Sequence, residues 1–128
     1  MGIKGLGVDL VQVSRIRNAI RRSGNRFLEK VYVSSEIDEY NKRKLASESS
    51  AHQYLASRWA VKEAVYKAVN PHVISWRDTS VRKNANGLPE IQPSVHLRQI
   101  LNTVGVNRIF LSISHDGDYA MAQVILEA

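Results

Sequence analysis

The strongest helical pattern in the chain runs from Tyr54 to Val69. Small apolar residues recur along it at helical spacing and give it a narrow apolar face. Pro71 follows shortly afterwards and predicts the end of the helix. The residues of the small apolar face are Ala60, Val61, Ala64, Val65 and Ala68.

The part of the chain before this helix predicts one strand and two further helices. Residues 3–13 are rich in Ile, Leu and Val and predict a mostly buried strand, in which Gly5 and Gly7 allow another backbone to approach closely. A first helix should follow this strand, and a second helix should begin at Ser34. Residues 45–53 are small and polar and predict a loop.

The part after the long helix predicts mainly strands. Residues 74–95 hold two weak strands separated by a turn at 84–89, and a short helix is expected over 97–103. The last two strands form a hairpin through residues 115–118, because Asp-Gly between apolar runs is typical of hairpin turns. We therefore expect an α+β fold, with an antiparallel sheet packed against helices, as a single domain over residues 1–128.

The composition restricts the chemistry and the kind of partner. There is no cysteine, which excludes disulfides, thiolate metal sites and cysteine nucleophiles. Eighteen Lys and Arg against twelve Asp and Glu give a net charge of +6, which points to an anionic partner: nucleic acid, an acidic protein or a phosphorylated small molecule. No apolar stretch approaches the roughly 20 residues that cross a bilayer, and residues 1–10 do not resemble a secretory signal. We expect a cytoplasmic protein, with the mitochondrial matrix as the alternative.

Three side chains suggest phosphate chemistry. Asp9 lies in an otherwise apolar strand, and Glu63 lies on the long helix one turn before Lys67. A Mg²⁺ site in a phosphoryl-transfer enzyme uses one or two carboxylates, and a neighbouring lysine could neutralise a pyrophosphate. Each residue also has a purely structural alternative: Asp9 could cap a helix or pair with Arg15, and Glu63 could form an i,i+4 pair with Lys67.

Three blocks of sequence resemble the signature motifs of the 4′-phosphopantetheinyl transferases. GVDLVQVSRI at residues 7–16 is similar to their opening G-x-D-x-x-x-x-x-R-I, and WAVKEAVYKA at 59–68 is similar to aromatic-x-x-K-E-A-x-x-K-A. SISHD at 112–116, followed by YAMA at 119–122, is similar to the closing S-x-S-H…Y-A-x-A block. The blocks stand in the family's order, cover residues 5–126 and have the spacing of its small, single-domain members.

The resemblance implies an activity and a set of site residues. The activity is transfer of the 4′-phosphopantetheine arm of coenzyme A to a serine hydroxyl of apo acyl carrier protein, for fatty acid biosynthesis. It implies Mg²⁺ held by Asp9 and Glu63, Lys67 on the pyrophosphate oxygens, and Glu63 as an aid to removing the serine proton. Arg58 and His115 resemble family positions that contact the nucleotide.

The resemblance also implies partners. Acyl carrier proteins are strongly acidic, so Arg15, Arg22 and Arg26 are expected to dock one, which would account for the positive charge without nucleic acid or a membrane. The basic residues 42–44 could meet the 3′-phosphate of coenzyme A, on charge alone. The small members of the family are trimers with the active site between subunits, and a homotrimer is expected here.

The chain departs from the family's pattern at three positions. Gln12 stands where many members carry an acidic residue, which leaves a third metal ligand to water or substrate. Leu88 replaces the lysine of a frequent N-G-K-P turn, and Trp59 replaces the commoner phenylalanine. Two other functions stay open at this point: a basic module that binds nucleic acid, and an inactive relative that only docks carrier proteins.

Overall fold

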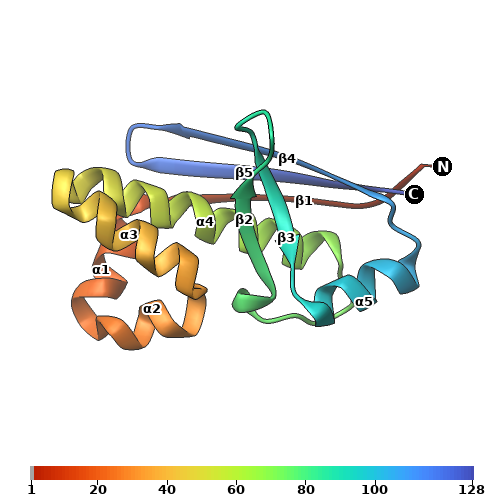
Figure 1. Ribbon diagram of the computed structural model, residues 1–128, viewed down its shortest axis with the longest axis horizontal. Coiled ribbons are helices and arrows are strands. Elements are labelled where there is room, and N and C mark those ends of the chain that lie inside the picture. The colour runs from red at the N-terminus through yellow and green to blue at the C-terminus, as the bar shows by residue number, and fades with distance from the viewer. Residues whose placement is uncertain (1) are drawn as a thin grey trace.

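The computed structural model describes residues 2–128, and a long helix against a three-stranded antiparallel sheet forms its centre (Figure 1). The helix is α4 (Glu48–Ala68). The strands are β1 (Ile3–Gln12), β4 (Arg108–Asp116) and β5 (Tyr119–Glu127), in the order β1-β5-β4. Within residues 2–128, no helix is both long enough and apolar enough to span a membrane.

Three helices gather around the N-terminal half of α4 (Figure 1). They are α1 (Val13–Ser23), α2 (Asn25–Val31) and α3 (Ser34–Ala46). Both α1 and α3 pack against α4. The N-terminal half of the chain is therefore helical apart from its first strand, but three helices precede α4 where the sequence predicted two.

A second, two-stranded sheet lies toward the other end of α4 (Figure 1). It pairs β2 (Thr79–Lys83) with β3 (Pro89–Pro93), and the short 3-10 helix η1 (Trp76–Asp78) leads into it. Helix α5 (Val95–Val104) then connects it to the closing hairpin. The predicted α+β class, with antiparallel pairing throughout, is confirmed.

The loop predicted over residues 45–53 is wrong, because α4 begins at Glu48. The hydroxyl of Ser47 accepts the backbone N–H of Ser50 at 3.1 Å and caps the helix. From Ala51 onward the inward face of the helix is buried. The polar composition of this segment reflects an exposed, capped first turn and not an interruption of the helix.

The close approach expected at the two glycines of β1 is confirmed, and α4 is the element that approaches. A Cβ built on Gly7 would overlap the backbone carbonyl of Ala64, and one built on Gly5 would overlap that of Ala68. Small residues on both surfaces therefore let the helix backbone lie directly on the strand. Because the two backbones are in direct contact, side chains of β1 and α4 that flank this contact can reach one another.

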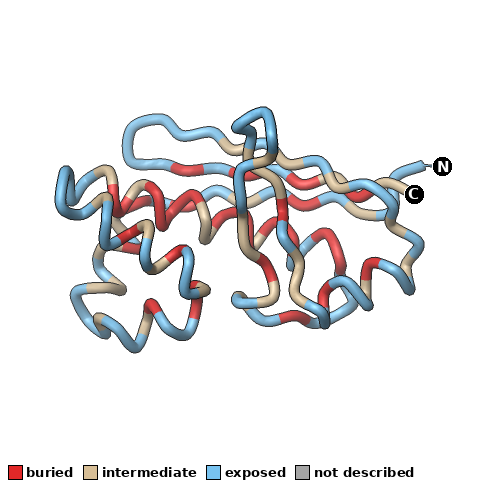
Figure 2. The backbone as a smooth tube through the Cα atoms, viewed as in Figure 1, coloured by how far each residue is buried: buried red, intermediate tan, exposed pale blue. Residues whose placement is uncertain are grey.

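The prediction that β1 is mostly buried is wrong for the chain taken alone (Figure 2). Leu6, Val8 and Leu10 are 58%, 48% and 60% exposed, because strand side chains alternate and the glycine side faces α4. Three large apolar residues of the neighbouring strands are exposed with them. We call this set the open sheet face: Leu6, Val8, Leu10, Phe110, Tyr119 and Met121.

Candidate active site

Asp9 and Lys67 meet across the contact between β1 and α4. The ammonium of Lys67 donates to the backbone carbonyl of Val8 at 2.9 Å and to Oδ1 of Asp9 at 3.2 Å. The side chain of Asp9 is 15% exposed and that of Lys67 is 51% exposed. Asp9 therefore pairs with Lys67 and not with Arg15. The ion pair offsets the cost of partly burying the Asp9 carboxylate. Its partner, Lys67, comes from the second sequence motif.

Glu63 lies on the helical turn before Lys67 but pairs elsewhere. Its Oε1 accepts a hydrogen bond of 2.8 Å from the indole Nε1 of Trp76. The i,i+4 pair of Glu63 with Lys67 is therefore not the arrangement that the helix adopts. Sequence reasoning missed Trp76, since it begins the short helix η1 and no periodic pattern connects it with α4.

Asp9 and Glu63 both offer carboxylate oxygens, the type of ligand that Mg²⁺ takes. Each carboxylate uses one oxygen in an internal hydrogen bond, Oδ1 to Lys67 and Oε1 to Trp76, which leaves the second oxygen of each for a cation. Across residues 2–128, no three His, Cys, Asp or Glu side chains gather in a group that could hold a metal. Mg²⁺ needs no such cage, because it keeps several waters and takes substrate phosphate oxygens.

Lys62, beside Glu63 in the sequence, belongs to the core. Its ammonium forms a fully buried ion pair with Oε1 of Glu36 at 2.8 Å, and it donates to the carbonyls of Trp76 at 3.1 Å and Thr79 at 2.6 Å. Burial lowers the pKa of Lys62, and the Glu36 carboxylate acts in the opposite direction. The residue joins α3 and α4 to the segment that carries Trp76.

Two arginines converge on Tyr54 in the N-terminal half of α4. The guanidinium carbons of Arg58 and Arg43 lie 4.5 Å and 4.6 Å from the centre of the Tyr54 ring. Nη1 of Arg58 donates to the hydroxyl of Ser57 at 3.1 Å, while its Nε is buried without a partner. Of the basic residues 42–44, Arg43 is thus the one that shares the Tyr54 ring with Arg58.

His115 lies at the end of β4, not within the hairpin turn, and it is exposed. The amide nitrogen of Gln53 lies 3.2 Å from its Nδ1. Nε2, the other ring nitrogen, takes no part in this contact. Gln53 lies on α4, so His115 contacts the helix that also carries Tyr54 and Arg58.

The predicted docking arginines lie on the surface of the helices that follow β1. Arg15 and Arg22 are exposed on α1, and Arg26 is exposed on α2. Two further arginines of α1, Arg17 and Arg21, line a cavity of about 240 Å³ between α1 and the start of α4. These two were not predicted as site residues.

The family can now be stated. The sequence model of the 4′-phosphopantetheinyl transferase superfamily matches residues 5–124, nearly the whole chain. The chain therefore belongs to that superfamily, and the resemblance seen in the three sequence blocks is confirmed.

Comparison with individual proteins identifies the group within the superfamily to which the chain is similar. The chain is 37% identical to a holo-[acyl-carrier-protein] synthase of Koribacter versatilis, over 98% of each chain. Its structure is similar to the crystal structure of the Neisseria meningitidis holo-[acyl-carrier-protein] synthase, with a TM-score of 0.87, 31% identity and coverage of 99% and 100%. It is also similar to the Helicobacter pylori holo-[acyl-carrier-protein] synthase in complex with coenzyme A, with a TM-score of 0.76, 28% identity and coverage of 95% and 99%. The chain groups with the holo-[acyl-carrier-protein] synthases.

Proposed function

We propose that this protein transfers the 4′-phosphopantetheine group of coenzyme A to a serine of apo acyl carrier protein, in fatty acid biosynthesis. The products are holo carrier protein and adenosine 3′,5′-bisphosphate. The observation that carries the proposal is the pairing of Asp9 with Lys67, which joins the first and second family motifs at one point of the fold. The similarity to a holo-[acyl-carrier-protein] synthase that binds coenzyme A supports the substrate.

The reaction is an in-line displacement at the β-phosphorus of coenzyme A. The serine oxygen forms a bond to that phosphorus, the bond to the bridging pyrophosphate oxygen breaks, and the nucleotide leaves with the electron pair. The protein's task is to position the groups and to neutralise the charge that develops. Lys67, held by Val8 and Asp9, supplies a fixed positive charge for the pyrophosphate, and Glu63 takes up the serine proton.

Asp9 and Glu63 would hold Mg²⁺ through their second carboxylate oxygens. A bound divalent cation supplies charge neutralisation on the phosphate oxygens and a fixed template for the two reacting groups. Gln12, the position at which many family members are acidic, donates instead to the hydroxyl of Tyr119 at 3.3 Å. The remaining ligand positions then fall to water and substrate.

The nucleotide end of coenzyme A is assigned to the surface around Tyr54. Arg58 and Arg43 offer two guanidinium groups to the 3′-phosphate, and a guanidinium is suited to bidentate phosphate contacts. His115, which contacts the same helix through Gln53, is proposed as a further contact to the nucleotide. Leu88, exposed in the β2–β3 turn, provides no charge for this purpose.

Mass spectrometry tests the activity directly. Apo acyl carrier protein incubated with this protein, coenzyme A and Mg²⁺ should gain the mass of one phosphopantetheine on its serine. Carrier protein that is bound but not modified would identify an inactive docking domain and would contradict the proposal. Omission of Mg²⁺ and addition of a chelator should abolish the gain if the assignment of the cation is right.

The arginines of α1 and α2 are proposed to dock the carrier protein, and reversal of one charge tests this. Arg22→Glu should raise the apparent KM for the carrier about tenfold, equivalent to about 1.4 kcal/mol, because an attractive charge becomes repulsive. The KM for coenzyme A should barely change. Steady-state kinetics with each substrate varied in turn gives both values.

The matched control for this prediction is Arg98→Glu. Arg98 is exposed on α5, so the change in net charge is identical but lies outside the docking helices. A higher salt concentration should raise the KM of the wild type for the carrier, as Arg22→Glu does, because salt screens exposed charges over about 8–10 Å. Equal effects of the two charge reversals would remove the docking role from Arg22.

A homotrimer is proposed because the chain resembles the small, trimeric members of the family, and the open sheet face offers a surface on which copies could pack. Burial of these exposed apolar side chains would be favourable, and neighbouring copies of the chain would cover them. Light scattering that returned the mass of a single chain, 14.4 kDa, would contradict the trimer. The cytoplasmic location expected from the sequence stays a prediction.

A further inference from the structure

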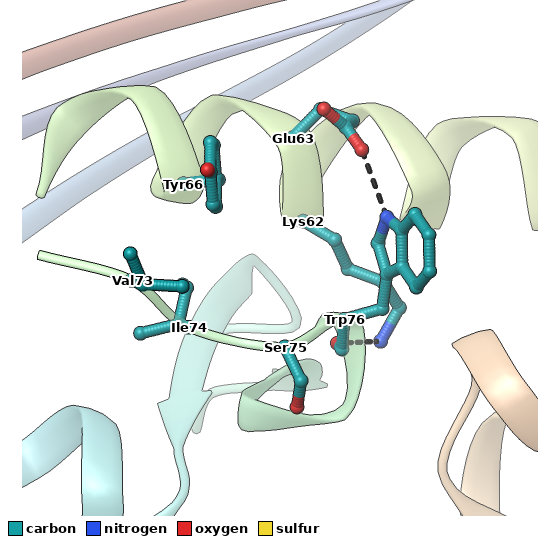
Figure 3. A pocket seen from close by; sticks show the side chains of 7 residues that line it. All are labelled: Lys62, Glu63, Tyr66, Val73, Ile74, Ser75 and Trp76. Carbon is teal, nitrogen blue, oxygen red and sulfur yellow. Dashed lines mark hydrogen bonds between the residues drawn. The ribbon is translucent and has the colours of Figure 1, made fainter. Parts of the chain in front are cut away.

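Trp76, the first residue of η1, contacts a proposed catalytic group. Its indole Nε1 donates to Oε1 of Glu63 at 2.8 Å (Figure 3). The two residues line a cavity of about 360 Å³ between α4 and residues 73–76. Figure 3 shows the indole approaching the helix from this segment, with its N–H directed at the carboxylate.

Two further contacts restrain Trp76, one at its backbone and one at its ring. Lys62, on the same helix, donates to the backbone carbonyl of Trp76 at 3.1 Å, so the backbone of the segment is tied to α4 (Figure 3). The ring stacks on Trp59, with centroids 5.4 Å apart and an angle of 28° between the planes. Trp59 in turn stacks on Phe27 at 6.1 Å.

These restraints make the donor rigid, whereas the acceptor is a long side chain. A glutamate side chain rotates about several bonds, so only a fraction of the molecules hold the carboxylate in the reactive orientation at any moment. A hydrogen bond from a fixed N–H to a carboxylate is charge-assisted and restricts that rotation before substrate arrives.

We propose that Trp76 is a positioning residue for the transfer reaction, whose indole N–H fixes one oxygen of Glu63 and leaves the second oxygen for the cation or the serine hydroxyl. The aromatic ring alone would not do this, because phenylalanine fills much the same space and stacks in the same way but carries no N–H donor. This inference rests on the proposed catalytic role of Glu63.

The first measurement is the nuclear magnetic resonance signal of the indole N–H groups in the ¹⁵N-labelled protein, without substrate. The chain has two tryptophans, so Trp59→Phe assigns the signal of Trp76. Glu63→Ala should shift that signal strongly, because the charged acceptor is lost, and Glu127→Gln should leave it in place. A Trp76 signal that does not respond to Glu63→Ala overturns the proposal whatever the activity of the variants.

The second measurement compares Trp76→Phe with Trp59→Phe, the same exchange of rings one position along the stack. Trp76→Phe should lower kcat about fivefold or more with little change in the KM for coenzyme A, because a contact to a charged group that acts in the reaction is lost. Trp59→Phe should change kcat by less than about twofold. Equal effects of the two variants would mean that only ring packing matters and would overturn the positioning role.

The failure of this proposal can be distinguished from failure of the proposed function. If the carrier protein is modified at a normal rate by Glu63→Gln, Glu63 has no catalytic task, and the positioning role fails with it even though the resonance shift remains. If Glu63→Gln is inactive but Trp76→Phe is fully active, the proposed function stands and Trp76 has no part in it.

Discussion

Glu63→Gln should lower kcat about a hundredfold or more, while the protein stays folded. The amide can neither take up the serine proton nor offer an anionic oxygen to Mg²⁺, and general-base assistance alone contributes about 10²–10⁴-fold. The side chain keeps its size and its acceptor oxygen for Trp76, so the packing around it should not change. The measurement is the initial rate of carrier modification at saturating coenzyme A and Mg²⁺.

Glu127→Gln is the matched control. It makes the same chemical change at the far end of β5, where Glu127 only forms an exposed ion pair with Arg108 at 3.7 Å. Such a pair contributes at most about 1 kcal/mol to stability and nothing to the reaction. Near-normal turnover of Glu63→Gln at saturating Mg²⁺ would show that the carboxylate is not needed, and the assignment of Glu63 as base and metal ligand would be wrong.

The sequence predicted the fold well where one local pattern decides the outcome. The closing hairpin, the turn before β3 and the close approach at Gly5 and Gly7 follow from turn chemistry and from the lack of a side chain. The start of α4 and the burial of β1 depend instead on what packs against each segment. Composition could not show that Leu6 and Leu10 lie on the side away from α4.

The candidate site was predictable to the extent that its residues stand in continuous motifs. Asp9 and Lys67 were named from two such motifs, and the structure pairs them. The role of Lys62 as a buried partner of Glu36 had no sequence signal, since both residues look like surface charges on amphipathic helices. The contact of Trp76 with Glu63 also depends on the path of the chain into η1, which periodicity does not describe.

Gly7→Ala should lower the free energy of unfolding by about 3 kcal/mol or more, or prevent folding. Its new methyl group would overlap the backbone carbonyl of Ala64, and neither the strand nor the helix has a flexible side chain there that could move aside. Urea unfolding of the variant and the wild type measures the difference.

Gly117→Ala separates this steric effect from the general cost of replacing a glycine. Gly117 has a φ of 56° in the hairpin turn, and a Cβ there meets nothing within 4 Å, so alanine should cost only the strain of that backbone conformation, about 1 kcal/mol. Equal destabilisation by the two variants would mean that α4 does not lie directly on β1. The difference matters for function because Lys67 reaches Val8 and Asp9 only across this contact. Any Gly7→Ala protein that still folds must move the helix outward, and it should lose transfer activity as the ion pair lengthens.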